Sequence, residues 1–398
     1  MIPRRALVLG LARQGRAAAD ALRRRGAEVV EADRELGNDA DLALLEGVEV
    51  LVKSGGVPNE APLAAAARER GVPVWSDVEL GFRILANPIL GVTGTNGKTT
   101  TSALLGAALG GPVAGNIGLA LCALDGAVPE DEWIVCELSS FQLEHIESFR
   151  PRIAVLLNLE PDHLDRHGSF EAYRAAKLRI FENQGPEDVA VLPRGFGPVP
   201  GAARRVEFSS DDPLPAEPLL RGRHNRENAA AATAAARAAG VGDEAIAEAL
   251  RAFPGVAHRL ELVATVDGVA YVNDSKATNV AAARPALEAY AGEPVHLILG
   301  GSLKGEDFAP LAAAIGPNVR RAYLVGEAAE QLAEALDTAG IEHEVAGDLE
   351  TAVRAASAAA RAGDVVLLSP ACASYDQFRD FEHRGDEFRR LVEELAHH

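Results

Sequence analysis

The residues best suited to phosphate chemistry form a glycine loop between an apolar run and a helical pattern. The segment Gly94-Thr95-Asn96-Gly97-Lys98-Thr99-Thr100 follows the apolar residues 89–93 and opens a predicted helix. Such a loop aims backbone N–H groups and a helix dipole at a polyphosphate. Lys98 would reach the β- and γ-phosphates, and the Thr99 hydroxyl would bind Mg²⁺. The segment departs from the P-loop pattern at Val92, where a glycine is expected, and it still predicts a nucleotide site.

Titratable residues follow two further apolar runs and suit a metal-assisted phosphate site. Glu137 directly follows the apolar residues 133–136, and His163 lies in the polar segment 158–167, which follows the apolar run 153–157. Because parallel strands bring their carboxyl ends to one edge of a sheet, we expect Glu137 to bind Mg²⁺ there. Considered alone, Glu137 would be an exposed strand-end residue and His163 a helix cap or surface residue. Their crowding favours a functional site.

Lysine is so rare in this chain that each one is informative. The sequence has 34 arginines and five lysines. An arginine supplies a fixed planar cation, whereas a lysine supplies a compact ammonium for a phosphate or an amine that reacts in its neutral form. Lys177 lies in a predicted helix that otherwise carries Arg174 and Arg179, so its retention predicts a special role. The five lysines are Lys53, Lys98, Lys177, Lys276 and Lys304.

Further polar segments occur in the second half of the chain. Residues 223–228 precede a run of alanines and are interpreted either as a helix cap or as a base- or substrate-recognition segment. In the C-terminal third, each polar segment follows a strand pattern, so a parallel sheet would gather them at one edge. Two of these segments contain a lysine. They are residues 255–261, 273–279, 300–304 and 369–378.

Alternating strand and helix patterns must position these residues, and they predict an α/β fold with three domains. A Rossmann-like first domain opens with a strand at 6–9, a helix at 14–25 and a strand at 28–31. A central P-loop-type domain follows, in which we expect the Pro- and Gly-rich residues 193–218 to be irregular. A hairpin with strands at 262–265 and 269–272 opens a Rossmann-like third domain. The predicted domains are residues 1–88, 89–255 and 256–398.

Composition and charge exclude several classes of protein. The chain has 398 residues, 48% hydrophobic and 24% charged, which excludes a disordered or fibrous protein. Its net charge of −19 argues against nucleic-acid binding, which needs a basic face. No apolar stretch reaches the roughly 18 residues of a membrane span, and no leader pattern begins the chain, so we expect a cytoplasmic protein. The spacing of Cys122, Cys136 and Cys372 indicates neither disulfides nor a zinc site.

The ordered succession of these motifs resembles the Mur ligases of peptidoglycan synthesis over essentially the whole chain. The resemblance is closest to the D-glutamate-adding group, which the sequence Ser-Pro-Ala-Cys-Ala-Ser-Tyr-Asp-Gln-Phe at 369–378 selects. An Asp-Asn-Pro-Arg run, expected in the diamino-acid-adding relatives, does not occur. The segments that carry the resemblance are 94–100, 137–143, 162–165, 224–228, 258–259, 273–279 and 369–378.

This resemblance implies a reaction and its substrates. ATP would phosphorylate the terminal carboxylate of UDP-N-acetylmuramoyl-L-alanine, and the D-glutamate amine would attack the acyl phosphate to form an amide. The first domain would bind the UDP substrate, the central domain ATP, and the third domain the amino acid while closing over the others. Two Mg²⁺ ions are implied, with Lys177 carbamylated by CO₂ so that it acts as a carboxylate-like ligand. We expect a monomer without nucleic-acid partners or a membrane span.

The resemblance also implies roles for individual residues. Lys98, Glu137, His163 and Lys177 would be catalytic, and Thr99, Glu137, His163 and Lys177 would hold the metal ions. ATP would contact Gly94, Thr95, Asn96, Gly97, Lys98, Thr99, Thr100, Asn228, Arg259 and Asp274. The UDP substrate would contact Arg13, Gln14, Arg34, Ser54, Gly56, Asn116, Ser139 and Gln142. D-Glutamate would contact His163, Thr278, Lys304, Ser374 and Phe381.

Three alternatives remain open on the sequence. A nicotinamide-dependent oxidoreductase would use Gly10, Gly15 and Asp33 as its dinucleotide fingerprint, although Ala12 replaces the middle glycine and the loop at 94–100 stays unexplained. A P-loop switch or motor ATPase would explain the central domain but not the polar segments of the third. A folylpolyglutamate synthetase, which adds L-glutamate to a folate, shares the central chemistry with the Mur ligases.

Overall fold

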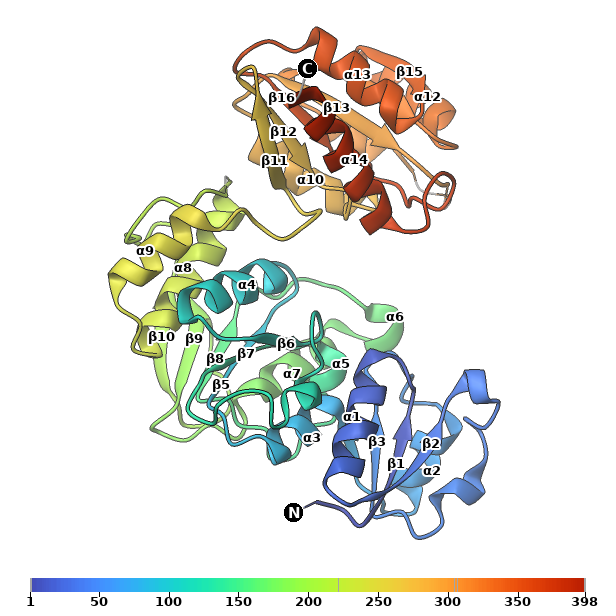
Figure 1. Cartoon of the computed structure of the whole chain (residues 1–398), viewed down its shortest axis with the longest axis vertical. Helices are drawn as coiled ribbons and strands as arrows, with labels where there is room; N and C mark the ends of the chain where they lie inside the picture. The colour runs from blue at the N-terminus through green and yellow to red at the C-terminus, as the bar shows by residue number, and fades with distance from the viewer. Residues whose placement is uncertain (1, 221, 304, 306, 397–398) are drawn as a thin grey trace. The chain divides into compact units, whose positions relative to one another are not determined.

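The computed structural model describes residues 2–220, 222–303, 305 and 307–396. It contains three sheets built mainly of parallel strands with helices packed on them, which confirms three α/β domains (Figure 1). The chain divides into two compact units, each described by itself. Unit 1 is Met1–Glu217 with His224–Ala252, and unit 2 is Pro218–Arg223 with Phe253–His398. Unit 1 holds the first two sheets, so the domain limits predicted at 88 and 255 stay predictions.

The first sheet has four parallel strands in the order β2-β1-β3-β4. After Arg5, the inner strand β1 is apolar because helices cover both faces: Ala6 and Val8 pack toward α1 and α3, and Leu7 and Leu9 toward α2. The strands are β1 (Arg5–Leu9), β2 (Glu28–Ala32), β3 (Val50–Lys53) and β4 (Val74–Ser76); the helices are α1 (Arg13–Arg24), α2 (Pro62–Glu69) and α3 (Asp77–Ile84), with short turns η1 (Arg34–Leu36) and η2 (Leu42–Leu45).

The second sheet has six parallel strands in the order β10-β9-β8-β5-β7-β6. Helix α4 packs beside α9, and α5 beside α7 (Figure 1). The strands are β5 (Ile89–Thr93), β6 (Val113–Gly115), β7 (Ile134–Glu137), β8 (Ile153–Leu156), β9 (Val189–Pro193) and β10 (Arg204–Phe208); the helices are α4 (Lys98–Leu109), α5 (Ser140–Leu143), α6 (Leu164–His167), α7 (Phe170–Leu178), α8 (Arg223–Ala238) and α9 (Asp243–Ala252), with η3 (Leu121–Leu124) and η4 (Arg179–Phe181).

One expectation about this sheet is wrong. Residues 193–218 are not wholly irregular, because Arg204–Phe208 forms the edge strand β10 and pairs with β9. Most of this strand is exposed, and only Phe208 is fully buried. An edge strand with one face in solvent lacks the apolar run that marks a buried parallel strand.

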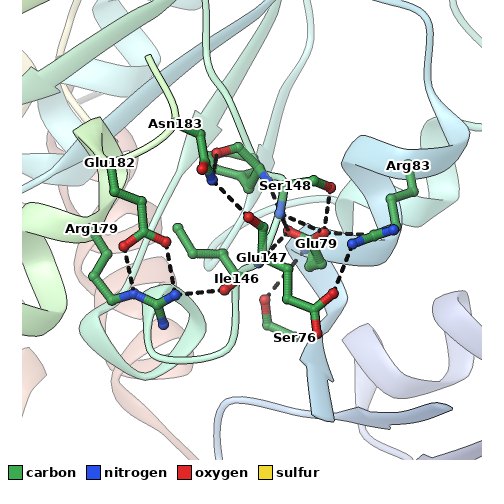
Figure 2. Close-up of polar contacts among 10 residues, drawn as sticks. Ser76, Glu79, Arg83, Ile146, Glu147, Ser148, Arg179, Glu182 and Asn183 are labelled. Atoms are coloured by element: carbon green, nitrogen blue, oxygen red, sulfur yellow. Dashed lines mark hydrogen bonds and ion pairs between the residues drawn. The ribbon is translucent and has the colours of Figure 1, made fainter. Parts of the chain in front are cut away.

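Helix α3 joins the first two sheets into one unit. Leu80 and Ile84 pack into the core of the first sheet, and Val78 packs into the core of the second. Glu79 points into the loop before β8, where its carboxylate accepts hydrogen bonds from the N–H groups of residues 147–149 at 2.9–3.1 Å and from the Ser148 hydroxyl at 2.6 Å (Figure 2). This buried carboxylate anchors α3 to the central domain.

A second set of side chains holds the same loop from its other side. Figure 2 shows Arg179 donating to the carbonyl oxygen of Ile146 at 2.6 Å and Asn183 donating to that of Glu147 at 2.9 Å. Burial alone would raise the pKa of Glu79, but the hydrogen bonds from Ser148 and the backbone, together with Arg83, lower it overall. The loop is therefore held by the Glu79 carboxylate on one side and by Arg179 and Asn183 on the other.

The third sheet has the order β11-β12-β16-β13-β14-β15 and is parallel except at its antiparallel edge pair β11 and β12. This pair confirms the predicted hairpin, whose turn residues Asp267 and Gly268 both have positive φ. The strands are β11 (Glu261–Val266), β12 (Val269–Asn273), β13 (Val295–Gly300), β14 (Val319–Val325), β15 (His343–Gly347) and β16 (Val365–Leu368); the helices are α10 (Val280–Ala289), α11 (Ala309–Ala314), α12 (Ala329–Ala339), α13 (Leu349–Ala359) and α14 (Phe381–Ala396).

Buried apolar residues explain why these elements form. Four side chains of β16, Val365–Leu368, are at most 1% exposed, as expected of a central strand with helices on both faces. Cys122, Cys136 and Cys372 are buried thiols. Within the part of the chain that the structure describes, no helix combines the length and the apolar character needed to cross a membrane.

Candidate active site

The glycine loop between β5 and α4 has the geometry of an anion-binding site. Gly94 has φ +155°, and Gly97, which directly precedes α4, has φ +81°; side-chain-bearing residues rarely adopt such values. The loop therefore presents backbone N–H groups and the positive end of α4. Lys98 Nζ lies over it and donates to the carbonyl oxygens of Gly94 at 2.9 Å and Thr95 at 2.7 Å. Thr99 lies in the first turn of α4.

Side chains from two distant segments fix this loop. Asn158, which follows β8, accepts a hydrogen bond from the N–H of Asn96 at 2.8 Å and donates to its carbonyl oxygen at 3.2 Å. Asn228 on α8 lies so close to Gly97 that a Cβ atom there would come within 2.1 Å of its Oδ1. The structure thus brings Gly94–Thr100 and Asn228 together, and Asn158 joins them as a contact that the sequence prediction missed.

Glu137 ends β7 beside β5, as predicted, and its side chain is buried. Oε1 accepts a hydrogen bond from Asn116 Nδ2 at 3.0 Å. Oε2 is also buried, and it has no hydrogen-bond partner among the residues that the structure describes. A buried carboxylate oxygen without a donor is costly unless a cation meets it. Glu137 therefore fits a divalent cation.

Lys177 on α7 is only 2% exposed, whereas Arg174 on the same helix is half-buried. Burial is the main cause that lowers the pKa of Lys177 to about 7; nearby Lys98 also lowers it, whereas Asp162 and Glu137 oppose the shift. These charges place the ammonium of Lys177 in the electrostatic field of Glu137 and of the glycine loop at 94–100, which we call the phosphate loop. The neutral amine of Lys177 is therefore far more accessible at neutral pH than that of an ordinary lysine.

Tyr173 links Lys177 to the phosphate loop. Its hydroxyl lies 2.9 Å from the Thr95 hydroxyl, and the Lys177 Nζ lies 4.8 Å from the centre of its ring. Burial raises the pKa of Tyr173 to about 12, so the hydroxyl stays protonated. The sequence prediction missed this residue. Its position one helical turn before a buried lysine is the signal that could have found it.

The two histidines near α6 differ in environment. His163 directly precedes α6 with φ +51°; its side chain is 49% exposed, and Nε2 lies 3.5 Å from Asp162. The His167 side chain is 1% exposed, and its ring nitrogens lie 2.9 Å from Glu144 Oε1 and 2.9 Å from Ser140 Oγ. His163 is thus the accessible histidine and His167 a packed one.

The predicted second metal set does not form through direct contacts. No hydrogen bond or ion pair joins His163 to Glu137 or Lys177 in the described part of the chain. The described residues also contain no group of three or more His, Cys, Asp and Glu side chains able to hold a metal. The roles of Thr99, His163 and Lys177 as ligands therefore stay predictions.

Ser139 and Gln142 form a capping box at the start of α5. The Gln142 Oε1 accepts from the Ser139 N–H at 3.1 Å, and the Ser139 Oγ accepts from the Gln142 N–H at 3.3 Å. Gln142 Nε2 donates to both carboxylate oxygens of Asp77 at 3.1 Å. Burial raises the pKa of Asp77 to about 6, and the Gln142 hydrogen bond opposes that rise. Substrate contacts of Ser139 and Gln142 stay predictions.

The predicted UDP-substrate residues of the first domain meet Asn116 of the central domain. Its carbonyl oxygen accepts from Arg13 at 3.1 Å and from Gln14 at 3.4 Å. The Ser54 hydroxyl donates to the carbonyl oxygen of Gly10 at 2.7 Å. The next residue, Gly55, lies near Ser139 and Gln142, at 3.7–3.9 Å from the position of a Cβ atom. Arg34 and Gly56 are exposed.

Asp33, the acidic residue of the oxidoreductase alternative, is already engaged by the protein. Its carboxylate accepts the N–H groups of Leu11 and Glu35, and these two bonds, with Arg16, lower its pKa. A dinucleotide-binding enzyme uses this position for the ribose hydroxyls. In this chain the carboxylate instead fixes the first turn of the domain.

Two predicted ATP residues belong to unit 2. Asp274 directly follows β12; it accepts hydrogen bonds from the N–H of Leu260 at 3.2 Å and from the Ser369 hydroxyl at 2.8 Å. Burial raises the pKa of Asp274 to about 7, against the Ser369 hydrogen bond and the charge of Arg259. Arg259 is half-buried. The remaining predicted ATP residues, Gly94–Thr100 and Asn228, belong to unit 1.

Three of the residues predicted for D-glutamate belong to loops at the carboxyl edge of the third sheet or to the adjoining helix. Thr278 follows β12 and donates its N–H to the carbonyl oxygen of Lys276 at 2.9 Å. Ser374 follows β16 and is buried, and Phe381 begins α14. Lys304, predicted as a fourth, lies outside the described residues.

The chain is similar to known proteins over nearly its whole length. The family model described as the Mur ligase middle domain matches residues 92–195, and the Mur ligase, glutamate ligase domain matches residues 258–372. UDP-N-acetylmuramoylalanine–D-glutamate ligase of Acidobacterium capsulatum is 43% identical over 99% of this chain and 96% of its own length. The chain belongs to the Mur ligase family. The enzyme of the same name from Anaeromyxobacter dehalogenans is 45% identical over 98% of both proteins.

Solved structures share the Mur ligase fold at low sequence identity. UDP-N-acetylmuramate–alanine ligase from Thermotoga maritima has a TM-score of 0.60 at 19% identity and covers 98% of this chain and 99% of its own. A folylpolyglutamate synthase/dihydrofolate synthase from Yersinia pestis has a TM-score of 0.54 at 21% identity, over 78% of this chain and 90% of its own. At such identities the likeness shows the fold alone, so the fold does not separate the Mur ligases from the folate enzymes.

Proposed function

We propose that the chain catalyses the ATP-dependent addition of D-glutamate to UDP-N-acetylmuramoyl-L-alanine in peptidoglycan precursor synthesis. The observation that carries this proposal is the identity of 43% and 45% over nearly the whole chain to relatives named for that reaction. The phosphate loop and the buried Glu137 supply the chemical groups that such a ligase needs. The reaction would run in the cytoplasm, where ATP is available, on a monomer.

The chemistry begins with a carboxylate, which is a poor electrophile until one oxygen becomes a leaving group. Transfer of the γ-phosphoryl group to the terminal carboxylate of the UDP substrate gives an acyl phosphate and ADP. The D-glutamate amine then attacks the carbonyl carbon, the C–O bond to phosphate breaks, and an amide and phosphate result. The first step brings two anions together, so positive charge must screen their repulsion.

Residues of unit 1 suit that first step. The N–H groups of the loop at 94–100 and the ammonium of Lys98 would hold the phosphates, with Asn228 supporting the loop. Thr99 and Glu137 would hold Mg²⁺, whose positive charge screens the phosphate oxygens. The unpartnered Glu137 Oε2 supports this assignment. His163, as a half-exposed imidazole, is available to a second ion and to D-glutamate.

Lys177 would act after carbamylation. Its neutral amine nitrogen would form a bond to the carbon of CO₂, one C–O π pair would move to oxygen, and the proton would pass to solvent. The resulting carbamate carries a negative charge like that of a carboxylate and suits the second Mg²⁺. The pKa of about 7 supports this role, because a protonated lysine has no free electron pair for CO₂.

Substrate contacts complete the proposal. The UDP substrate would lie along Arg13, Gln14, Arg34, Ser54, Gly56, Asn116, Ser139 and Gln142, which extend from the first sheet to the central domain. D-Glutamate has two carboxylates. Its site therefore needs hydrogen-bond donors for them and no protein carboxylate facing the amino-acid side chain. Thr278, Lys304, Ser374 and the backbone at Phe381 would supply these donors, and Arg259 and Asp274 would contact ATP.

One assay tests this function: phosphate release from ATP with UDP-N-acetylmuramoyl-L-alanine and one amino acid at a time. We expect release with D-glutamate and none with L-lysine or meso-diaminopimelate. Release with a diamino acid instead would overturn the assignment within the family. Release with a folate and L-glutamate, but not with the UDP substrate, would assign the folylpolyglutamate reaction.

A further inference from the structure

The residues predicted to bind D-glutamate lie on separate loops, which must be held at fixed distances from one another. Thr278 follows β12, the Gly300-Gly301 segment lies at the end of β13, and Ser374 follows β16, so they come from three separate strands. Phe381 begins α14. A two-carboxylate ligand needs these groups at fixed separations, and loops at a sheet edge need additional contacts to hold such separations.

Arg384 in the first turn of α14 contacts all three loops. Its side chain is 1% exposed. Nε donates to the Ser275 hydroxyl at 2.9 Å, and Nη2 donates to the carbonyl oxygens of Ser275 at 2.9 Å and Cys372 at 3.0 Å. Nη1 donates to the carbonyl oxygens of Ala373 at 3.2 Å and Gly300 at 3.3 Å. A guanidinium has five N–H groups, and these five bonds use all of them.

Ser275 extends this arrangement to the start of the helix. Its hydroxyl accepts from Arg384 and donates to the carbonyl oxygen of Phe381 at 2.8 Å. Apart from Gly300, the acceptor residues lie within three positions of a predicted D-glutamate residue: Ser275 precedes Thr278 by three, Cys372 and Ala373 precede Ser374 by two and one, and Phe381 is itself one. The guanidinium is thus the shared hydrogen-bond donor behind the predicted pocket.

The electrostatic environment of Arg384 is unusual for a buried cation. None of its five hydrogen bonds goes to a carboxylate; four go to carbonyl oxygens and one to a hydroxyl. Burial lowers the pKa of Arg384 to about 10, against the charges of Cys372, Asp376 and Asp274, so it stays charged at neutral pH. Carbonyl oxygens of three loops replace the water that would hydrate the guanidinium. They offset its desolvation free energy only while all three loops keep their positions.

We propose that Arg384 is a positioning residue for the D-glutamate site, which sets the separations of Thr278, Ser374 and the Phe381 backbone without touching the amino acid. This inference rests on the proposed function. Lysine has three donors and no planar fork, so it cannot hold five acceptors on three loops. The defect of an Arg384→Lys enzyme therefore falls on the amino acid rather than on ATP.

The first experiment compares Arg384→Lys with Arg389→Lys in the phosphate-release assay. Arg389 lies on the same helix but pairs with Glu261 and Asp386, away from the three loops. We expect Arg384→Lys to raise the KM for D-glutamate about tenfold or more, the loss expected for hydrogen bonds of a charged donor, with the KM for ATP changed less than about twofold. Arg389→Lys should leave the KM values for D-glutamate, ATP and the UDP substrate unchanged. Equal rises in every KM for Arg384→Lys, or no rise, would overturn the inference.

A second variant covers the case in which Arg384→Lys does not fold. Ser275→Ala removes the hydroxyl between Arg384 and Phe381 but leaves the fold's core intact. It should raise the KM for D-glutamate about three- to tenfold and leave that for ATP unchanged. In Arg384→Ala, millimolar methylguanidinium should restore part of the affinity for D-glutamate. An unchanged KM in Ser275→Ala contradicts the inference, whereas a wild type that ignores D-glutamate contradicts the proposed function instead.

Discussion

At the scale of single residues, the environment of Lys177 leads to the first prediction. Lys177→Arg retains a cation that stays protonated and cannot be carbamylated, so activity should fall about a hundredfold, as for loss of a metal-site group. Lys177→Ala should recover part of its activity with added acetate or formate, which can occupy the vacated position. Wild-type activity in bicarbonate should rise as pH increases through about 7, because the amine loses its proton there.

Two controls sharpen this test. Arg174→Ala changes the same helix on its more exposed side and should leave activity unchanged. Mass spectrometry of the native protein under CO₂ should detect the added mass of a carbamate in the wild type and not in Lys177→Arg. Full activity of Lys177→Arg would rule out the carbamate.

Asp77 gives a second prediction at this scale, about pH. Its folded pKa of about 6 lies above the ordinary value near 3.9, so between these values the folded protein retains a proton that the unfolded chain has lost. The free energy of unfolding therefore decreases as pH rises from about 4 to about 6 and levels off above that, by up to about 3 kcal/mol. Asp77→Asn, which cannot ionise, should lack this decrease.

The measurement is a urea unfolding series across pH 4–7. Other carboxylates titrate over the same range, so the relevant quantity is the difference between the wild type and Asp77→Asn. The exposed Asp131→Asn serves as control and should follow the wild type. A difference that does not vary with pH would refute the raised pKa. Arg13 and Lys53, whose charges act on Asp77, stay unchanged in all three proteins.

At the scale of elements, a substitution at Glu79 tests how much the contact between α3 and the loop at 146–149 contributes to stability. Glu79→Gln removes the negative charge from a carboxylate that accepts five hydrogen bonds from that loop. We expect a loss of about 2–4 kcal/mol in the free energy of unfolding, as for a broken buried charged network. Because the folded pKa of Glu79 is lowered, this contribution is present above its ordinary value and is lost as pH falls below it.

Glu147→Gln is the matched control, since that half-exposed side chain lies on the same loop and pairs with Arg83 of α3. A surface pair of this kind contributes about 1 kcal/mol or less. Equal unfolding midpoints for both variants would show that the anchor is unimportant. If the loss occurs for Glu79→Gln, a fluorescent label on each of the first two sheets should report one common unfolding transition in the wild type.

Elements also show how far the sequence predicts the structure. The apolar runs located nearly all the buried strands, and the glycine spacing located the phosphate loop, because both are local patterns. The helix after that loop begins at Lys98 and includes Thr99, Thr100 and Thr101 in its first turn despite the low helix propensity of threonine. Glu79 and Arg384 were not predicted. Their partners are mainly backbone atoms 68–109 residues away or in separate loops, and no sequence pattern marks such partners.

At the scale of the whole molecule, the division of the predicted ATP residues between the units gives the last prediction. The loop at 94–100 belongs to unit 1, whereas Arg259 and Asp274 belong to unit 2. We expect nucleotide and UDP substrate together to reduce the radius of gyration toward about 21 Å, the value for a compact chain of this length. X-ray scattering measures this change. Lys98→Ala should abolish the response, and an unchanged radius in the saturated wild type would contradict closure.

The chain path of unit 1 has a consequence for how the protein is made. After Glu217 the chain leaves this unit and returns at His224 to add α8 and α9. A ribosome releases residues in order, so the two sheets of unit 1 emerge before the helices that complete it. Helix α4 gains its neighbour α9, and Gly97 its contact with Asn228, only when residues up to about 252 have left the exit tunnel. The phosphate loop is thus among the first motifs synthesised in unit 1 and among the last to reach its final environment.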